Sequence, residues 1–282
     1  MKNILLLTDF SKNAKAAAAT ALTLSQKLHT DLLLLNTYVF YPTPENYVGG
    51  LWPIELFKEI EEDSQERLFE LKRQLEELSP KTLEPGDRLP VIGTEVESTA
   101  LTFGIGDVME KNKIELIVMG THDEEALGKN HVNDLIGYTK CPVLVVPPAA
   151  DLKKAKEIVY ATDYSFQDIA AIAYLAKIAR AFALEMKVVH VAEPGEKAAE
   201  ERDKMIFENH LKKIHNGPIS YHVIRGEEVV KRLLRMITSE HAGLLAMLHR
   251  HQSLFGKLFM HSDTKELLKS KKIPVLVFPT KE

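Results

Sequence analysis

The sequence predicts an α/β fold made of two tandem, doubly wound domains, each with a five-stranded parallel sheet. First, the segment KNILLLTDFS (Lys2–Ser11) returns as KEIVYATDYS (Lys156–Ser165). Second, both halves close on nearly the same segment, PVLVVP (Pro142–Pro147) and PVLVFP (Pro274–Pro279). Third, short apolar runs alternate with longer helical stretches in each half, which is the pattern of repeated β-α-β units.

The repeat predicts one domain at residues 1–150 and a second at residues 151–282. The length agrees, because 282 residues correspond to about two domains of ~100–200 residues each. The opening motif recurs after 154 positions and the closing segment after 132, so the first copy is longer in its interior by 22 residues. The lysine-rich stretch 149–156 is the expected linker.

Each half is expected to open with a buried strand and a capped helix. Ile4–Leu7 and Ile158–Ala161 are apolar throughout, as strands are when both faces of a parallel sheet are covered. Ser11 and Ser165 follow where a helix N-cap belongs. Asp168 stands three residues after Ser165, which resembles a capping box.

The later elements follow one order in both halves, and right-handed crossovers make their strands parallel. In the first half we expect a helix at Ala14–Leu28, a strand at Leu32–Leu35, a helix that ends with Asp107–Asn112 and a strand at Ile114–Gly120. In the second half we expect a helix at Ile169–Leu184, a strand at Met186–Val191, a helix at Glu227–Ser239 and a strand at Gly243–Leu248.

The extra residues of the first half lie within Phe40–Pro90. They begin with a loop rich in Pro and Gly and continue with a charged amphipathic helix at Ile54–Leu78. The shorter counterpart in the second half is Glu196–His215. We expect the long helix to cover the sheet or pack on the other domain, or to present a surface to a partner.

Composition excludes several classes of protein. The net charge of −4 gives no attraction to nucleic acid or to an anionic membrane. No apolar stretch reaches the ~18–20 residues that span a bilayer. Cys141 is the single cysteine, so no intrachain disulfide can form, and no leader pattern follows Met1. The expected location is the cytoplasm, and Cys141 is expected to be an inert thiol.

These motifs resemble the universal stress protein family. The resemblance is carried by TDFS after the first strand, LIVMGTH at the fourth strand and CPVLVVP at the close of the first half. It covers essentially the whole chain and is weaker in the second half, where LLAMLHR replaces LIVMG. It implies a tandem two-domain member with a Rossmann-like fold of the adenine nucleotide alpha hydrolase type, active in the stress response.

Nucleotide-binding members of this family carry a G-x2-G-x9-G-[ST] loop after the fourth strand, where glycines let the backbone approach phosphate. The matching positions here are Gly120 and Thr121, then Asp123 at the second glycine, then Lys129 and Asn130 at the final pair. One of the three glycines remains, although Gly128 restores part of the motif if the alignment shifts by one residue. The resemblance therefore implies that ATP or AMP binds weakly at most.

In the second half the same positions hold Leu248, His251, His261 and Ser262. If either half binds an anion, we expect it to be this one, because Arg250 and Lys257 add positive charge and Ser262 can cap a helix. A solvated basic loop is the alternative. The histidine spacing fits no zinc pattern, so no metal is expected.

Asp9 and Asp163 stand where the first strand of each half ends. The resemblance implies that they lie near the adenine of a bound nucleotide. The alternative is that they are turn-forming residues between strand and helix. A phospho-acceptor role would need an acidic pair early in the strand, where Ile4 and Leu5 are apolar.

Three functions remain open: a non-catalytic stress-response protein, a nucleotide-binding sensor or slow ATPase, and a protein-interaction module. The incomplete loops favour the first, and no acid/base pair indicates catalysis. The expected partner is the other half of the chain, in a pseudo-dimer through the closing strands Val143–Val146 and Val275–Phe278. A homodimer and an unknown protein partner are further possibilities.

Overall fold

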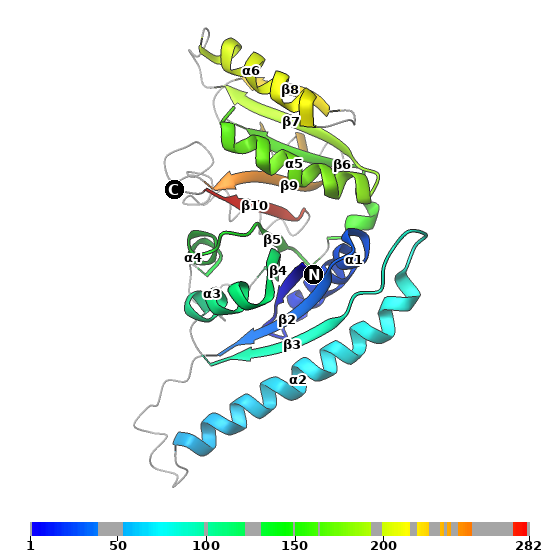
Figure 1. Cartoon of the computed structure of the whole chain (residues 1–282), viewed down its shortest axis with the longest axis vertical. Coiled ribbons are helices and arrows are strands. Elements are labelled where there is room, and N and C mark those ends of the chain that lie inside the picture. Colours follow the sequence, from blue (N-terminus) through cyan, green and yellow to red (C-terminus); the bar gives the residue numbers. More distant parts are fainter. Residues whose placement is uncertain are drawn as a thin grey trace. The chain divides into compact units, whose positions relative to one another are not determined.

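The chain folds into two compact α/β units, Met1–Cys141 and Pro142–Glu282 (Figure 1). The computed structural model describes residues 2–38, 53–98, 101–121, 131–148, 150–162, 164–192, 199–214, 219–225, 232–233, 236–237, 242–249 and 273–280. In each unit, helices accompany parallel strands, so the predicted fold class is confirmed.

The described strands of the first unit form a parallel sheet in the order β3-β2-β1-β4. Its elements are β1 (Asn3–Leu7), α1 (Lys12–Leu28), β2 (Asp31–Thr37), α2 (Pro53–Thr82), β3 (Ile92–Glu97), α3 (Leu101–Asn112), β4 (Ile114–Gly120) and α4 (His131–Tyr138). The strand β1 is hydrogen-bonded on both edges, and its residues from Ile4 to Leu7 are buried. The fourth strand has the bounds that the sequence predicted.

The second unit carries parallel strands in the order β8-β7-β6-β9-β10, and β5 joins β10 in the antiparallel direction. Its elements are β5 (Val143–Val146), a short 3₁₀ helix (Leu152–Lys154), β6 (Glu157–Thr162), α5 (Phe166–Ala181), β7 (Glu185–Ala192), α6 (Ala199–Ile214), β8 (Ile219–Arg225), β9 (Ala242–His249) and β10 (Val275–Pro279). The predicted pairing of the two closing strands is confirmed, with Val143 opposite Val277. The helix predicted at Glu227–Ser239 lies mostly outside the described residues.

Both predicted helix caps are confirmed. The Ser11 hydroxyl accepts a hydrogen bond from the Ala14 N–H at 3.3 Å. Ser165 and Asp168 form the full capping box at the start of α5. This helix ends at Ala181, three residues before the predicted end, because Ala183 takes the left-handed conformation with φ 53° and closes the helix.

The helix α2 is longer than predicted and packs on β2 and β3. Leu68 and Leu75 are buried on its inner face. Its outer face carries ion pairs one turn apart, such as Arg73 with Glu70 at 2.9 Å and with Glu77 at 3.1 Å. The helix therefore covers the sheet, as the sequence predicted.

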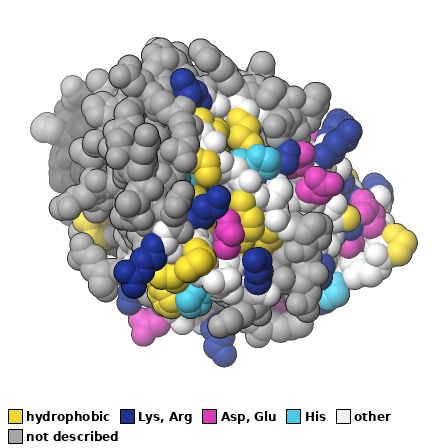
Figure 2. Space-filling model, turned by 90° about the horizontal axis from the view of Figure 1, so that it is seen from above, with side chains coloured by type: hydrophobic (Ala, Val, Ile, Leu, Met, Phe, Trp, Pro, Cys, Tyr) yellow, Lys and Arg dark blue, Asp and Glu magenta, His cyan; other side chains and the backbone are white. Residues whose placement is uncertain are grey.

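Side chains of both charges are mixed on the face that Figure 2 shows, where Lys and Arg side chains lie among acidic and hydrophobic ones. Among the described helices, none combines the length and the apolar character needed to cross a membrane.

Candidate functional site

The carboxyl ends of β1 and β4 lie side by side in the first unit. Leu7 is opposite Met119 in the parallel pair, so the residues that follow the two strands share one edge of the sheet. Open parallel sheets bind ligands at this edge. The structure therefore brings together three predicted site residues, Asp9, Gly120 and Thr121.

Seven predicted site residues lie outside the described part of the chain: Lys129, Asn130, Asp163, Arg250, Lys257, His261 and Ser262. Their roles stay predictions. The described site consists of the strand ends and of the first turns of the helices that follow them.

Asp9 forms a turn between β1 and α1. Its Oδ1 accepts a hydrogen bond from the Ser11 N–H at 2.9 Å. One residue earlier, the Thr8 hydroxyl accepts a hydrogen bond from the Phe10 N–H at 3.0 Å. Asp9 thus acts as the turn-forming residue that the sequence allowed, and its carboxylate helps to cap the chain before α1.

The aromatic residue of the repeated motif adopts a left-handed backbone in both units. Phe10 and Tyr164 each have φ of 61°. In the second unit the Thr162 hydroxyl accepts a hydrogen bond from the Tyr164 N–H at 2.8 Å, as Thr8 does in the first. Left-handed backbone is an outlier for a bulky residue and is often found at functional sites. The repeated aromatic residue is the only sign of this backbone conformation in the sequence, and the conformation was not predicted from it.

Gly120 is required by the close approach of α1. A Cβ atom at this position would lie 2.9 Å from the backbone oxygen of Asn13 and 3.0 Å from its carbonyl carbon. In the second unit Ala161 is opposite Met247, so the next residue, Leu248, occupies the place of Gly120. Leu248 is 5% exposed. One strand end therefore lets backbone approach closely, and the other is filled by an apolar side chain.

A polar side chain supports the motif threonine from the neighbouring strand in each unit. Asn36 donates a hydrogen bond to the Thr8 carbonyl at 2.7 Å. The Nδ1 of His190 lies 3.0 Å from the Thr162 carbonyl. Because a carbonyl oxygen only accepts, this nitrogen of His190 carries the hydrogen. The His190 ring also stacks on Tyr164, with centroids 4.0 Å apart.

Cys141 is expected to react slowly with iodoacetamide. Its thiol donates to the Ile114 carbonyl at 2.9 Å, and burial with the nearby charge of Glu115 raises its pKa to about 11. At pH 8 the thiolate fraction is then roughly 100-fold below that of an ordinary cysteine. Mass spectrometry of alkylated protein measures this, and protein unfolded in urea is the control. Equal rates in both states would contradict the prediction.

In the residues that the structure describes, no group of three His, Cys, Asp or Glu side chains could hold a metal ion.

One family model matches most of this chain. The model of the Universal stress protein family matches residues 1–147 and 154–279. A universal stress protein from Archaeoglobus fulgidus has 18% identity and a TM-score of 0.70, with 99% of this chain and 97% of that chain covered. A functionally unknown protein from Pseudomonas aeruginosa PAO1 has 12% identity and a TM-score of 0.56, with 98% and 92% covered. A search of curated proteins gives no match.

A universal stress protein solved in complex with cAMP is also similar. It has 20% identity over 44% of this chain and 96% of that chain, with a TM-score of 0.35.

Proposed function

This chain belongs to the universal stress protein family, and we propose that it is a non-catalytic, cytoplasmic stress-response member in which the nucleotide loops are incomplete. The observation that carries this proposal is the different use of the same strand end in the two units. Gly120 serves the approach of α1, and the equivalent Leu248 is buried. The glycine of the first unit is therefore explained by helix packing, and the second unit has no glycine at this position. Neither strand end shows a glycine that is needed for phosphate alone.

Two further observations support the proposal. The Asp9 carboxylate accepts a hydrogen bond within its own turn, which gives this residue a structural use besides any adenine contact. In the second unit, the ring of His190 covers Tyr164 at the matching edge. A nucleotide-binding sensor or slow ATPase that uses one unit is the alternative, and its test is direct binding.

ATP and cAMP are expected to bind weakly. Asp123 would repel phosphate, and the missing glycines keep the backbone away from it. Calorimetry with Mg-ATP and with cAMP should show no saturation below about 1 mM. Micromolar affinity would contradict the proposal, and Gly128→Ala would then test the shifted alignment of the loop.

If a phosphate-bearing ligand binds at all, we expect the second unit to hold it. Replacing Arg250 and Lys257 together with alanine should abolish binding, because two positive charges of the loop are lost. Lys129→Ala in the first unit is the matched control and should leave binding unchanged. The reverse pattern, or binding that ignores all three residues, would exclude this assignment.

A further inference from the structure

A groove opens in the first unit between the start of α1 and the middle of α2. Its volume is about 530 Å³, within the ~300–1,000 Å³ that ligand sites usually have. One wall runs from Thr8 to Lys15, and the other from Asp63 to Gln74 along α2. At 1.5 Å per residue the helical wall is about 16 Å long, which matches roughly five residues of extended chain.

In the second unit, aromatic contacts join the start of α5 to α6. Phe207 of α6 packs edge-on against Tyr164 with centroids 5.6 Å apart, and Phe207 is 2% exposed. Phe166, in the first turn of α5, packs edge-on against His210 at 5.9 Å. In the first unit, the guanidinium of Arg67 lies over the Phe10 ring at 4.3 Å. The aromatic residue of the motif therefore contacts an aromatic ring of α6 in the second unit and a guanidinium of α2 in the first.

An exposed aromatic side chain lines the groove. Phe69 is 65% exposed, although it lies on a helix whose outer surface is otherwise mostly charged. An exposed ring beside a groove is the usual anchor of a protein contact, because a partner can bury it in a desolvated centre. Leu71 and Ala14 add apolar surface within the groove.

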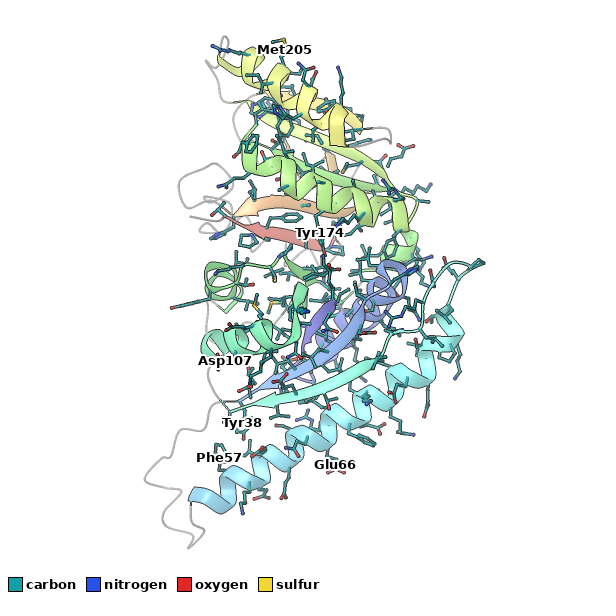
Figure 3. The ribbon with its side chains drawn as sticks, in the orientation of Figure 1. Tyr38, Phe57, Glu66, Asp107, Tyr174 and Met205 are labelled. Carbon is teal, nitrogen blue, oxygen red and sulfur yellow. The ribbon has the colours of Figure 1, made fainter. Side chains whose placement is uncertain are left out.

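The negative charge of α2 favours a partner that carries a positive charge. The helix contains nine Asp and Glu against five Lys and Arg, so its net charge of −4 equals that of the whole chain. In the groove, Asp63 pairs with Arg67 at 3.6 Å, and Glu70 pairs with Arg73 at 2.9 Å. Glu66, midway along α2 in Figure 3, makes no ion pair with any described residue. Lys15 is the cation that lines the opposite wall.

We propose that this groove is a docking site for a short extended segment of a partner protein, in which an aromatic or aliphatic side chain stands beside a Lys or Arg. The apolar side chain would pack on Phe69 and the ring of Phe10. The cation would meet Glu66 on the α2 wall. The groove differs from the strand-end site, because Asp9, Gly120 and Thr121 are not among the residues that line it.

A random heptapeptide library, selected against the full-length protein, tests the proposal. Selected peptides should be rich in Lys or Arg next to Phe, Tyr, Trp or Leu. Their affinity, measured by fluorescence anisotropy, should fall at least tenfold in the double variant Phe69→Ser/Glu66→Lys, and it should weaken as salt rises. Both side chains are exposed, so the variant should keep the circular dichroism spectrum of the wild type.

The matched control is Leu78→Ser/Glu62→Lys, which replaces an exposed apolar side chain and an exposed carboxylate of α2 outside the groove. It should bind the selected peptides like the wild type. The proposal is overturned if the selected peptides are acidic, if both double variants bind them equally well, or if selection enriches no peptide.

Discussion

Replacing Gly243 with alanine is expected to destabilise the second unit by about 3 kcal/mol or more. A Cβ atom at this position in β9 would lie 1.8 Å from the Cβ of Ala155 and 2.6 Å from its Cα. The clash involves backbone, so no flexible side chain can move aside. Relief requires a shift of the strand or of the segment that follows the 3₁₀ helix, and either shift disturbs the pairing of β9 with β6.

Urea unfolding followed by circular dichroism measures this loss, and hydrogen exchange of the β9 amides locates it. Gly106→Ala is the matched control, because a Cβ there meets nothing within 4 Å and alanine in α3 should stabilise by about 0.5–1 kcal/mol. Adding Ala155→Gly to Gly243→Ala should recover part of the loss, since the shortest contact disappears. A Gly243→Ala protein as stable as the wild type would contradict the clash.

The positions of the buried strands could be predicted from the sequence, whereas those of the edge strands could not. The apolar runs at β1, β4, β6 and β9 are covered on both faces, so their composition alone marks them. The edge strand β3 has the sequence IGTEVE, of which only Ile92 is buried. A strand with one covered face and one paired edge has no need of a continuous apolar run. Its position follows from the topology rather than from its residues.

The candidate site was predictable in its members but not in their roles. Strand ends placed Asp9, Gly120 and Thr121 together, as parallel topology requires. A glycine at a strand end, however, can allow either phosphate or a helix to approach the backbone. The packing role of Gly120 is seen only in the structure, where an added Cβ would lie too close to the Asn13 backbone. The contact between Phe10 and Arg67 joins residues far apart in sequence, so no local pattern could indicate it.

Replacing Asp168 with alanine is expected to destabilise the protein by about 3–5 kcal/mol. The carboxylate is 1% exposed and is part of the α5 capping box. It accepts hydrogen bonds from the hydroxyls of Tyr160 at 2.5 Å and Thr162 at 2.6 Å, and from the Ser165 N–H at 3.1 Å. Alanine would remove this acceptor from the buried hydroxyls of Tyr160 and Thr162 and would remove half of the helix cap. Thermal and urea unfolding of the variant measure the loss.

A comparison with the first unit indicates a variant that tests why Asp168→Ala loses stability. It has Leu6 and Ala14 where the second unit has Tyr160 and Asp168, so the same turn forms there without a buried carboxylate. If unsatisfied donors dominate, Tyr160→Phe added to Asp168→Ala should recover about 1 kcal/mol, because donor and acceptor are then both absent. If the double variant is no more stable than Asp168→Ala, the Tyr160 hydrogen bond contributes nothing measurable, and the loss comes from the cap at Ser165 and the Thr162 hydroxyl.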